Sequence, residues 1–337
     1  MFNFDEARFI RIQSGAVALA APLDELIGKL LAAGKKNVFF LGAGGAAMLM
    51  QPAAQLMQRH STFPAFWDLT AELALDGSRH FGKDSIVVIP SRSGTTKESV
   101  EMLAYCRAKG ATSITLVGNA GTPLATKADY SFVNFCEDDT SSECFYLESL
   151  LIALSIMKRR GECDAYDALV ADIAKLPKLL LEVKRAYEPK AAAFAKAIKD
   201  SPYHIFTGAG SAWTEANYYS MCILEEMQWI RTRPVHASDF FHGPLELVEK
   251  GVSVILFKGE DSCRPIADRV EAFAPKHTDK LTVLDTKTMA LPGVSDQLRA
   301  LISPVLLATV LERISAQLEI MTNHPLTTRR YYNRVAY

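Results

Sequence analysis

The stretch FFLGAGGA, at Phe39–Ala46, is a short apolar run that ends in a glycine-rich turn. The same pattern returns as IFTGAGSA at Ile205–Ala212, 166 residues further along the chain (Gly42 to Gly208). In both places a β-rich run leads through Gly-Ala-Gly into a stretch with helical character. This repeat predicts that the chain contains two copies of one α/β unit.

Short apolar runs rich in β-branched and aromatic residues alternate with helix-like stretches along both copies. Such alternation is typical of a parallel sheet covered by helices on both faces. One helix-like stretch, Glu98–Lys109, places Val100, Leu103, Ala104 and Ala108 on one face. The predicted strands are Asn37–Leu41, Thr62–Trp67, Ser85–Ile89, Ser113–Val117 and Tyr130–Phe135 in the first copy, and the strand before Gly208, Ser253–Phe257 and Leu281–Leu284 in the second.

The predicted fold class is therefore α/β, with two tandem units that each contain a parallel β-sheet flanked by helices. We expect the N-terminal unit over residues 1–165 and the C-terminal unit over 201–323. The segment between them, 166–200, is rich in Ala, Leu, Lys and Glu and is expected to form connecting helices. Residues 324–337 are expected to form a C-terminal tail.

The composition excludes several classes of protein. The chain has 337 residues, a formal net charge of −1 and 49% hydrophobic residues, which suits two globular units without a basic surface for nucleic acid. The most apolar segment, FYLESLLIALSIM, contains Glu148 and is too short to cross a bilayer, and the N-terminus has acidic residues where a signal peptide needs basic ones. We expect a cytoplasmic protein with no membrane partner. Its cysteines show no metal-ligand spacing and are expected to be reduced thiols, at positions 106, 136, 144, 163, 222 and 263.

A hydroxyl-rich stretch, IPSRSGTTKES at Ile89–Ser99, follows the third predicted strand. Ligands of open parallel sheets bind where such strands turn into the next helix and leave backbone N–H groups unpaired. A glycine that permits a close turn, several hydroxyl donors and a helix N-terminus together suit a phosphate group without a metal. An ordinary turn with a helix N-cap explains the same residues, so both interpretations stay open.

The glycine turn raises a rival interpretation. Gly42–Ala47 fits the pattern GxGxxA, and Asp68 follows the second predicted strand, where a ribose-binding acid stands in nicotinamide-dependent oxidoreductases. A dinucleotide site explains neither the hydroxyl stretch nor the second Gly-Ala-Gly turn. It is therefore the less favoured alternative.

SRSGTT at Ser91–Thr96, together with Glu226 and the segment HASDFFHGPLE at His236–Glu246, resembles the sugar-isomerase (SIS) family. EMQWI, FFHGP and the ending HPLTTRRYYNRVAY are similar to the fructosamine-6-phosphate deglycases within it, and the isomerase half of glucosamine-6-phosphate synthase is a further look-alike. The resemblance covers nearly the whole chain. It implies a flavodoxin-like sheet in each unit and a homodimer with active sites at the subunit interface.

The resemblance assigns roles to particular residues. Ser91, Ser93 and Thr96 match the phosphate-binding hydroxyls of the family, and Glu226 and His242, 16 residues apart, match its catalytic pair. The remaining candidates are Gly44 and Gly45 in the first-strand turn, where relatives often have Thr or Ser, and Glu143, which family position puts near the sugar.

Three departures bear on the activity. Asp239 stands where relatives usually have Glu, and none of these 337 residues resembles the glutaminase domain of the synthase. The tail has Asn333 or Arg334 where the synthase has a lysine. Synthesis of an amino sugar from glutamine is therefore not expected.

The expected function is removal of an amine from a fructosamine 6-phosphate, with Glu226 as base, His242 as acid and no metal or cofactor. The alternatives are a phosphosugar aldose–ketose isomerase and a sugar-phosphate-binding regulatory protein. His236 and His324 are interpreted as hydrogen-bonded structural groups. For Arg329 and Arg330 an ion pair within the tail and contact with a phosphate or substrate carboxylate both remain open.

Overall fold

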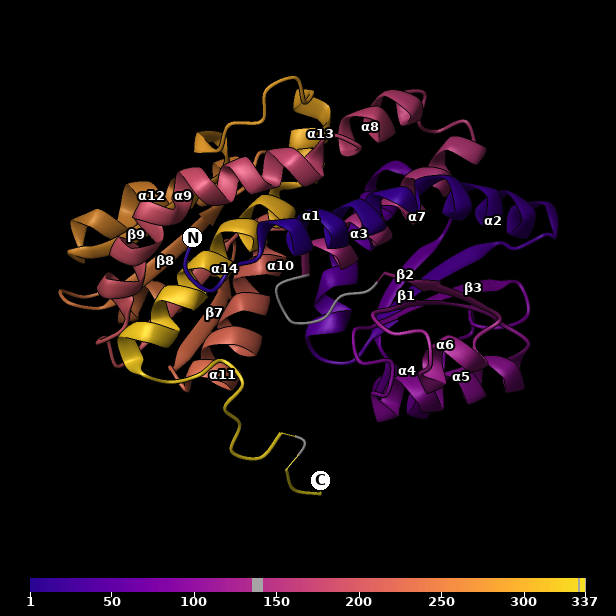
Figure 1. Ribbon diagram of the computed structural model, residues 1–337, viewed down its shortest axis with the longest axis horizontal. Helices are drawn as coiled ribbons and strands as arrows, with labels where there is room; N and C mark the ends of the chain where they lie inside the picture. Colours follow the sequence, from indigo (N-terminus) through magenta and orange to yellow (C-terminus); the bar gives the residue numbers. More distant parts are fainter. Residues whose placement is uncertain (135–141, 333, 337) are drawn as a thin grey trace. The chain divides into compact units, whose positions relative to one another are not determined.

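The computed structural model describes residues 1–134, 142–332 and 334–336. It divides the chain into two compact units (Figure 1). The N-terminal unit comprises Glu6–Pro177, and the C-terminal unit comprises Lys178–Tyr337 together with Met1–Asp5. Each unit is built around one parallel sheet flanked by helices, which confirms the predicted fold class.

The N-terminal sheet has five parallel strands in the order β2-β1-β3-β4-β5. This is the flavodoxin-like order, in which the chain reverses direction across the sheet between the first and third strands. Dinucleotide-binding sheets instead keep the first three strands in the order 3-2-1, so the topology disfavours the oxidoreductase alternative. The strands are β1 (Asn37–Gly42), β2 (Ala65–Leu69), β3 (Ser85–Ser91), β4 (Thr112–Val117) and β5 (Tyr130–Val133).

Helices cover both faces of this sheet. Figure 1 shows α4, α5 and α6 on one face and α1, α2, α3 and α7 on the other. The helices are α1 (Glu6–Ala18), α2 (Ala20–Ala32), α3 (Gly45–His60), α4 (Thr70–Asp76), α5 (Lys97–Lys109), α6 (Pro123–Lys127), α7 (Ser142–Arg159) and α8 (Tyr166–Ile173).

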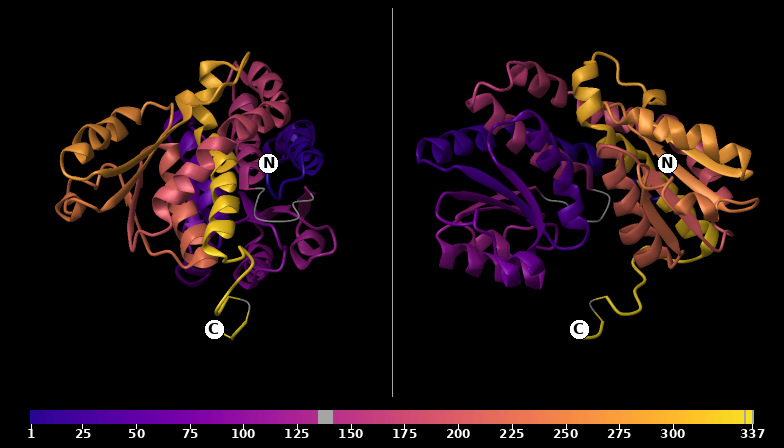
Figure 2. Two further views of the ribbon diagram at one scale, coloured as in Figure 1. Left: turned by 60° about the vertical axis from the view of Figure 1, so that its left-hand side comes forward. Right: turned by 180° about the vertical axis from the view of Figure 1, so that it is seen from behind.

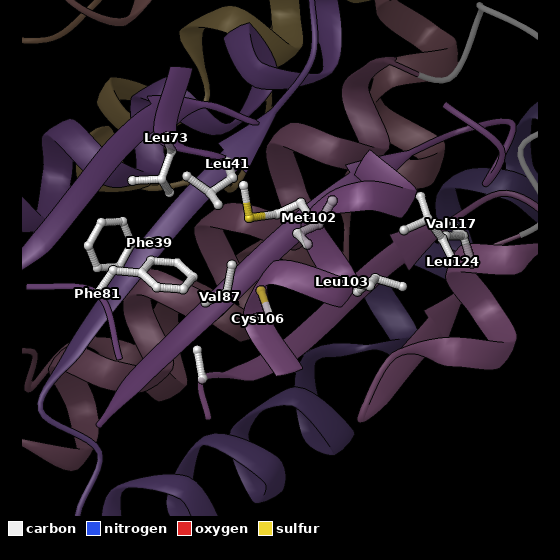
Figure 3. Close-up of a cluster of buried hydrophobic side chains, with 12 residues drawn as sticks. Phe39, Leu41, Leu73, Phe81, Val87, Met102, Leu103, Cys106, Val117 and Leu124 are labelled. Carbon is white, nitrogen blue, oxygen red and sulfur yellow. The ribbon is translucent and has the colours of Figure 1, made fainter. Parts of the chain in front are cut away.

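The layer between the sheet and α5 forms an apolar core, shown in Figure 3. Phe39 and Val87 of the sheet lie in this core with side chains of α5. The buried residues of α5 are Ser99, Met102, Leu103 and Cys106. The predicted face was wrong in part, because Ala104 and Ala108 are exposed.

The C-terminal sheet has four parallel strands in the order β7-β6-β8-β9. They are β6 (His204–Gly208), β7 (Thr232–His236), β8 (Ser253–Lys258) and β9 (Lys280–Asp285). The helical elements are α9 (Leu176–Ile198), α10 (Ser211–Tyr218), the π-helix η2 (Tyr219–Glu225), α11 (Glu226–Gln228), η3 (Pro244–Leu247), α12 (Arg264–Phe273), η4 (Ala274–Lys276), η5 (Thr286–Thr288), α13 (Asp296–Leu301) and α14 (Ser303–Thr322).

The two sheets share one topology. In each, the first strand lies between the second and third strands, so β1 pairs with β3 and β6 pairs with β8. The Gly-Ala-Gly turn follows β1 in one unit and β6 in the other. Each unit thus has a switch point, formed by the turn after its first strand and the turn after its third.

The cysteines and the apolar helices bear on two of the expectations drawn from the composition. Cys106, Cys144, Cys163, Cys222 and Cys263 form no disulfide, and Cys136 lies outside the described residues. In the described parts of the chain, no helix is long and apolar enough to cross a membrane.

His204 is a fully buried titratable group in the C-terminal sheet. Its Nδ1 lies 2.8 Å from the Ser253 hydroxyl oxygen on the neighbouring strand. Burial, which disfavours the charged imidazolium, lowers the pKa of His204 to about 4. The ring is therefore neutral in the folded protein near neutral pH.

This burial predicts a loss of stability in mild acid. Between the ordinary histidine pKa of about 6.5 and the folded pKa, the unfolded chain binds a proton that the folded chain does not, so stability falls as pH falls. We expect His204 to account for about 2 kcal/mol of the loss between pH 7.5 and pH 5. Urea unfolding of His204→Gln should show a correspondingly shallower pH dependence than the wild type. An unchanged slope would contradict this assignment, and His277→Gln, at an exposed histidine of the same unit, serves as the control.

Candidate active site

The hydroxyl loop Ser91–Thr96 lies at the switch point of the N-terminal sheet. Ser91 ends β3 and is buried, whereas Ser93 is exposed. The Ser91 hydroxyl oxygen lies 3.1 Å from that of Thr96 and 3.4 Å from that of Ser93. Three hydroxyl groups from one turn thus gather beside the N-terminus of α5.

Hydrogen bonds fix the shape of this loop. The Gly94 N–H donates to the Ser91 hydroxyl oxygen at 3.0 Å, and the Thr95 N–H donates to that of Ser93 at 3.3 Å. Gly94 has φ 66°, and a Cβ there would lie 2.1 Å from the Thr122 hydroxyl oxygen, so only glycine fits. Thr96 occupies the N-cap position of α5, yet its side chain makes no capping hydrogen bond. N-capping by Thr96 therefore does not account for this hydroxyl.

The first-strand turn lies at the same switch point. Gly44 has φ 54° and stands at the N-cap position of α3, with Gly45 as the first residue of that helix. At Gly42 a Cβ would lie 2.5 Å from the Ala47 nitrogen, so strand and helix meet too closely for any larger residue. The turn thus presents backbone groups and a helix N-terminus, which favour an anion.

Glu143 lies in the first turn of α7, and only 1% of its surface is exposed. A helix N-terminus favours a negative charge at this position. The residues just before α7 lie outside the described part of the chain.

Glu226 follows directly on the π-helix η2, at the start of α11. Short π-helical insertions occur frequently at functional sites. The segment ends at Trp229, whose backbone is left-handed at φ 57°. The Glu226 carboxylate accepts a hydrogen bond from Nε of Arg329 in the C-terminal tail at 2.8 Å, and both side chains are partly exposed.

The tail contacts the Glu226 segment at several further points. The Gln228 amide donates to the His324 carbonyl oxygen at 2.7 Å. The Arg330 guanidinium lies 3.8 Å from the centroid of the Trp229 ring. Figure 2 shows the tail running on beyond the end of α14. For the tail arginines, the structure shows an ion pair between Arg329 and Glu226 and, for Arg330, a contact with an aromatic ring that neither possibility included.

His242 lies in the turn after β7 and is exposed. The turn is anchored because the Ala237 N–H donates to the Gly208 carbonyl oxygen at 2.8 Å and Phe240 is fully buried. The His242 N–H donates to the carbonyl oxygen of Asp239, itself an exposed residue. Gly243, with φ 131°, then redirects the chain into η3.

The other two histidines of this region have structural contacts. His236 accepts a hydrogen bond from the Ser238 N–H through Nδ1 at 3.1 Å. The His324 ring packs against Trp229 with 4.3 Å between ring centroids, but its Nε2 makes no hydrogen bond within the described residues. A side-chain hydrogen bond is thus seen for His236, whereas His324 is held by its ring contact and by backbone hydrogen bonds, from Gln228 to its carbonyl oxygen and from its N–H to the Glu319 carbonyl oxygen.

The sequence-predicted residues fall into two groups on different units. Gly44, Gly45, the hydroxyl loop and Glu143 belong to the N-terminal unit, and Glu226 and His242 belong to the C-terminal unit. Among the described residues, no group of three or more His, Cys, Asp or Glu side chains could hold a metal ion. The π-helix before Glu226 had no recognisable signal in the sequence.

The comparisons with known proteins agree with this fold. Residues 31–155 match the model of the SIS domain family. It is 29% identical to fructosamine deglycase FrlB of Bacillus subtilis (strain 168), over 94% of this chain and 95% of that protein. It is 24% identical to fructoselysine 6-phosphate deglycase of Escherichia coli (strain K12), over 88% of this chain and 85% of that one.

Solved structures show the same architecture. A Bacillus subtilis protein described as a proposed phosphosugar isomerase superposes with a TM-score of 0.86 and 28% identity, covering 96% of this chain and 99% of that one. The C-terminal domain of glucosamine-fructose-6-phosphate aminotransferase from Francisella tularensis gives a TM-score of 0.80 at 16% identity, with 95% and 96% covered, and this likeness concerns the fold alone.

Proposed function

We propose that this protein is a fructosamine-6-phosphate deglycase, which releases glucose 6-phosphate and an amine or amino acid. The coarser class, an enzyme of the sugar-phosphate isomerase and deglycase type, is supported by relatives that match nearly the whole chain. The observation that carries the proposal is the hydroxyl loop Ser91–Thr96 at the N-terminal switch point, where three hydroxyl groups meet a helix N-terminus. Such a site suits the phosphate group that substrates of both deglycases and phosphosugar isomerases carry.

The proposed chemistry needs one base and one acid. Glu226 removes a proton from C1 of the substrate, which gives an enaminol, and protonation at C2 then gives an imine at C1. Water adds to the imine carbon and the C–N bond breaks, which releases the amine and leaves the aldehyde of glucose 6-phosphate. His242 donates and accepts protons at the sugar oxygens during ring opening and proton transfer.

A phosphosugar isomerase is the second candidate, because the same proton shift on a substrate with oxygen in place of nitrogen interconverts a ketose and an aldose. The structural match to a protein described as a proposed phosphosugar isomerase supports this second candidate. Incubation with fructoselysine 6-phosphate and, separately, with fructose 6-phosphate distinguishes the candidates. Amine release supports the deglycase, aldose formation from fructose 6-phosphate alone supports the isomerase, and binding without turnover supports a regulatory protein.

The proposed phosphate-binding role of the hydroxyl loop leads to a testable prediction. Replacing both Ser91 and Ser93 by alanine should raise KM for a phosphorylated substrate while turnover at saturation changes far less. Each lost hydrogen bond to a charged phosphate should cost about 1.5–3 kcal/mol, so the rise in KM should be tenfold or more. Steady-state kinetics of the double variant and of Ser93→Ala test this prediction.

Ser93→Ala is the cleaner change, because Ser93 is exposed and its hydroxyl accepts the Thr95 N–H at 3.3 Å, whereas the buried Ser91 hydroxyl accepts the Gly94 N–H at the shorter distance of 3.0 Å. Ser78→Ala is a matched control, since the Ser78 hydroxyl oxygen likewise accepts an N–H two residues further on, from His80 at 3.3 Å, away from the switch point. A double variant that loses thermal stability but keeps its KM would show that the hydroxyls only shape the turn.

A further inference from the structure

The switch point of the C-terminal unit contains a carboxylate from the chain itself. Asp261 lies in the loop between β8 and α12, which corresponds in topology to the hydroxyl loop of the N-terminal unit. Its Oδ2 accepts hydrogen bonds from both the backbone N–H and the hydroxyl of Ser211, each at 2.8 Å. Its Oδ1 accepts one from the Cys263 N–H at 2.9 Å. Three donors therefore converge on one negative group beside the N-terminus of α10.

The first-strand turns of the two units have the same backbone conformation. Gly44 has φ 54° and ψ −131°, Gly210 has φ 58° and ψ −139°, and each stands at the N-cap position of the following helix. Their surroundings differ. Apart from the residues next to Gly44 in the chain, no described heavy atom lies within 4 Å of the point that a Cβ on Gly44 would occupy. At Gly210, the carboxylate atoms of Asp261 lie 2.3–2.6 Å from the corresponding point. Accordingly Gly44 is exposed and Gly210 is buried.

The loop that carries Asp261 is braced from several sides. The neighbouring carboxylate of Glu260 accepts two hydrogen bonds from the Arg299 guanidinium, at 2.8 and 2.7 Å. The Glu260 N–H donates to the Ser303 hydroxyl oxygen at 2.9 Å, and Arg264 donates to the Gly259 carbonyl oxygen at 2.9 Å. The position of the Asp261 carboxylate over Gly210 is therefore set by the fold around it.

A carboxylate and a phosphate are both oxyanions, and both are stabilised by backbone N–H groups and hydroxyls at a helix N-terminus. We propose that Asp261 is a built-in anion, which takes the position of an oxyanion ligand and closes the switch point of the C-terminal unit. Each chain then has one switch point open to a phosphate group, at the N-terminal unit. The proposal rests on the duplicated topology and does not depend on the deglycase activity.

Asp261→Ala tests the proposal by chemical rescue. Loss of three charge-assisted hydrogen bonds should lower Tm by about 5–10 °C at low ionic strength. Inorganic phosphate or sulfate should restore Tm along a saturating curve, whereas chloride at the same ionic strength should not. Calorimetric titration with inorganic phosphate should show one more site per chain than in the same protein with Asp261 intact. The variant is best made in the Ser91→Ala, Ser93→Ala background, so that the N-terminal loop contributes little to the signal.

Two further variants separate the effect of the Asp261 charge from a general loss of stability. Asp279→Ala is the matched control: its carboxylate also accepts a backbone N–H, from Gly251 at 2.9 Å, but away from the switch point, so phosphate should not rescue it specifically. Asp261→Asn fills the turn without a charge, and we expect a lowered Tm that phosphate does not restore. An Asn variant as stable as the wild type, or an Ala variant that folds but gains neither rescue nor a phosphate site, would overturn the proposal.

Discussion

Glu226→Gln is expected to lower turnover by roughly 10²–10⁴-fold, the range typical of a lost general base. The amide keeps the size of the carboxylate and one hydrogen-bond acceptor, but it cannot take a proton from C1 of the substrate. Because the phosphate is proposed to bind in the other unit, substrate affinity should change little. Single-turnover kinetics, with a separate binding measurement, test both parts of this expectation.

The contact with Arg329 shows why this loss should not come from unfolding. The Glu226–Arg329 ion pair is partly exposed, and such pairs typically contribute at most about 1 kcal/mol. Glu225→Gln is a matched control, because it removes the same charge one residue earlier, where the exposed carboxylate accepts hydrogen bonds from Thr232. Full activity in Glu226→Gln, or an equal loss in Glu225→Gln, would end the proposed role of Glu226 as the base.

Much of the fold could be predicted from the sequence because its signals are local. Apolar runs of four to seven residues bounded by turns identify strands, and the repeated Gly-Ala-Gly turn identifies two units with one topology. The face of α5 that packs on the sheet was predicted less accurately. Alanines carry little apolar surface, so Ala104 and Ala108 give weak evidence of direction, and the larger Met102 with Cys106 sets which face packs on the sheet.

The residues of the candidate site also differ in how well the sequence alone predicts them. A glycine between short hydroxyl residues after a buried strand indicates the loop Ser91–Thr96 without any knowledge of tertiary structure. Glu226 and His242 rest on family resemblance, since a lone carboxylate or histidine has many structural uses. The Arg329 contact joins residues 103 positions apart and has no local signal. Asp261 could have been suspected only by aligning the two copies beyond their glycine turns.

His242→Asn is expected to lower turnover as well, by about 10²-fold or more, because ring opening and proton delivery lose their titratable group. The side chain is exposed, so the fold should be little affected. Substrate should still bind, because its phosphate is proposed to be held by the loop Ser91–Thr96. His277→Asn, at another exposed histidine of the same unit, is the control, and full activity in His242→Asn would contradict its role.

The same pair of variants tests whether an active site is shared between two chains. We propose a homodimer in which Glu226 of one chain and His242 of the other serve one site. In a mixed dimer of Glu226→Gln and His242→Asn, one of the two sites would then have both native residues. Random subunit exchange should therefore restore about a quarter of the wild-type activity, because about half of the dimers are mixed. If mixed dimers form, as mass spectrometry can show, and activity stays absent, both residues serve the site of their own chain and the shared-site arrangement is wrong.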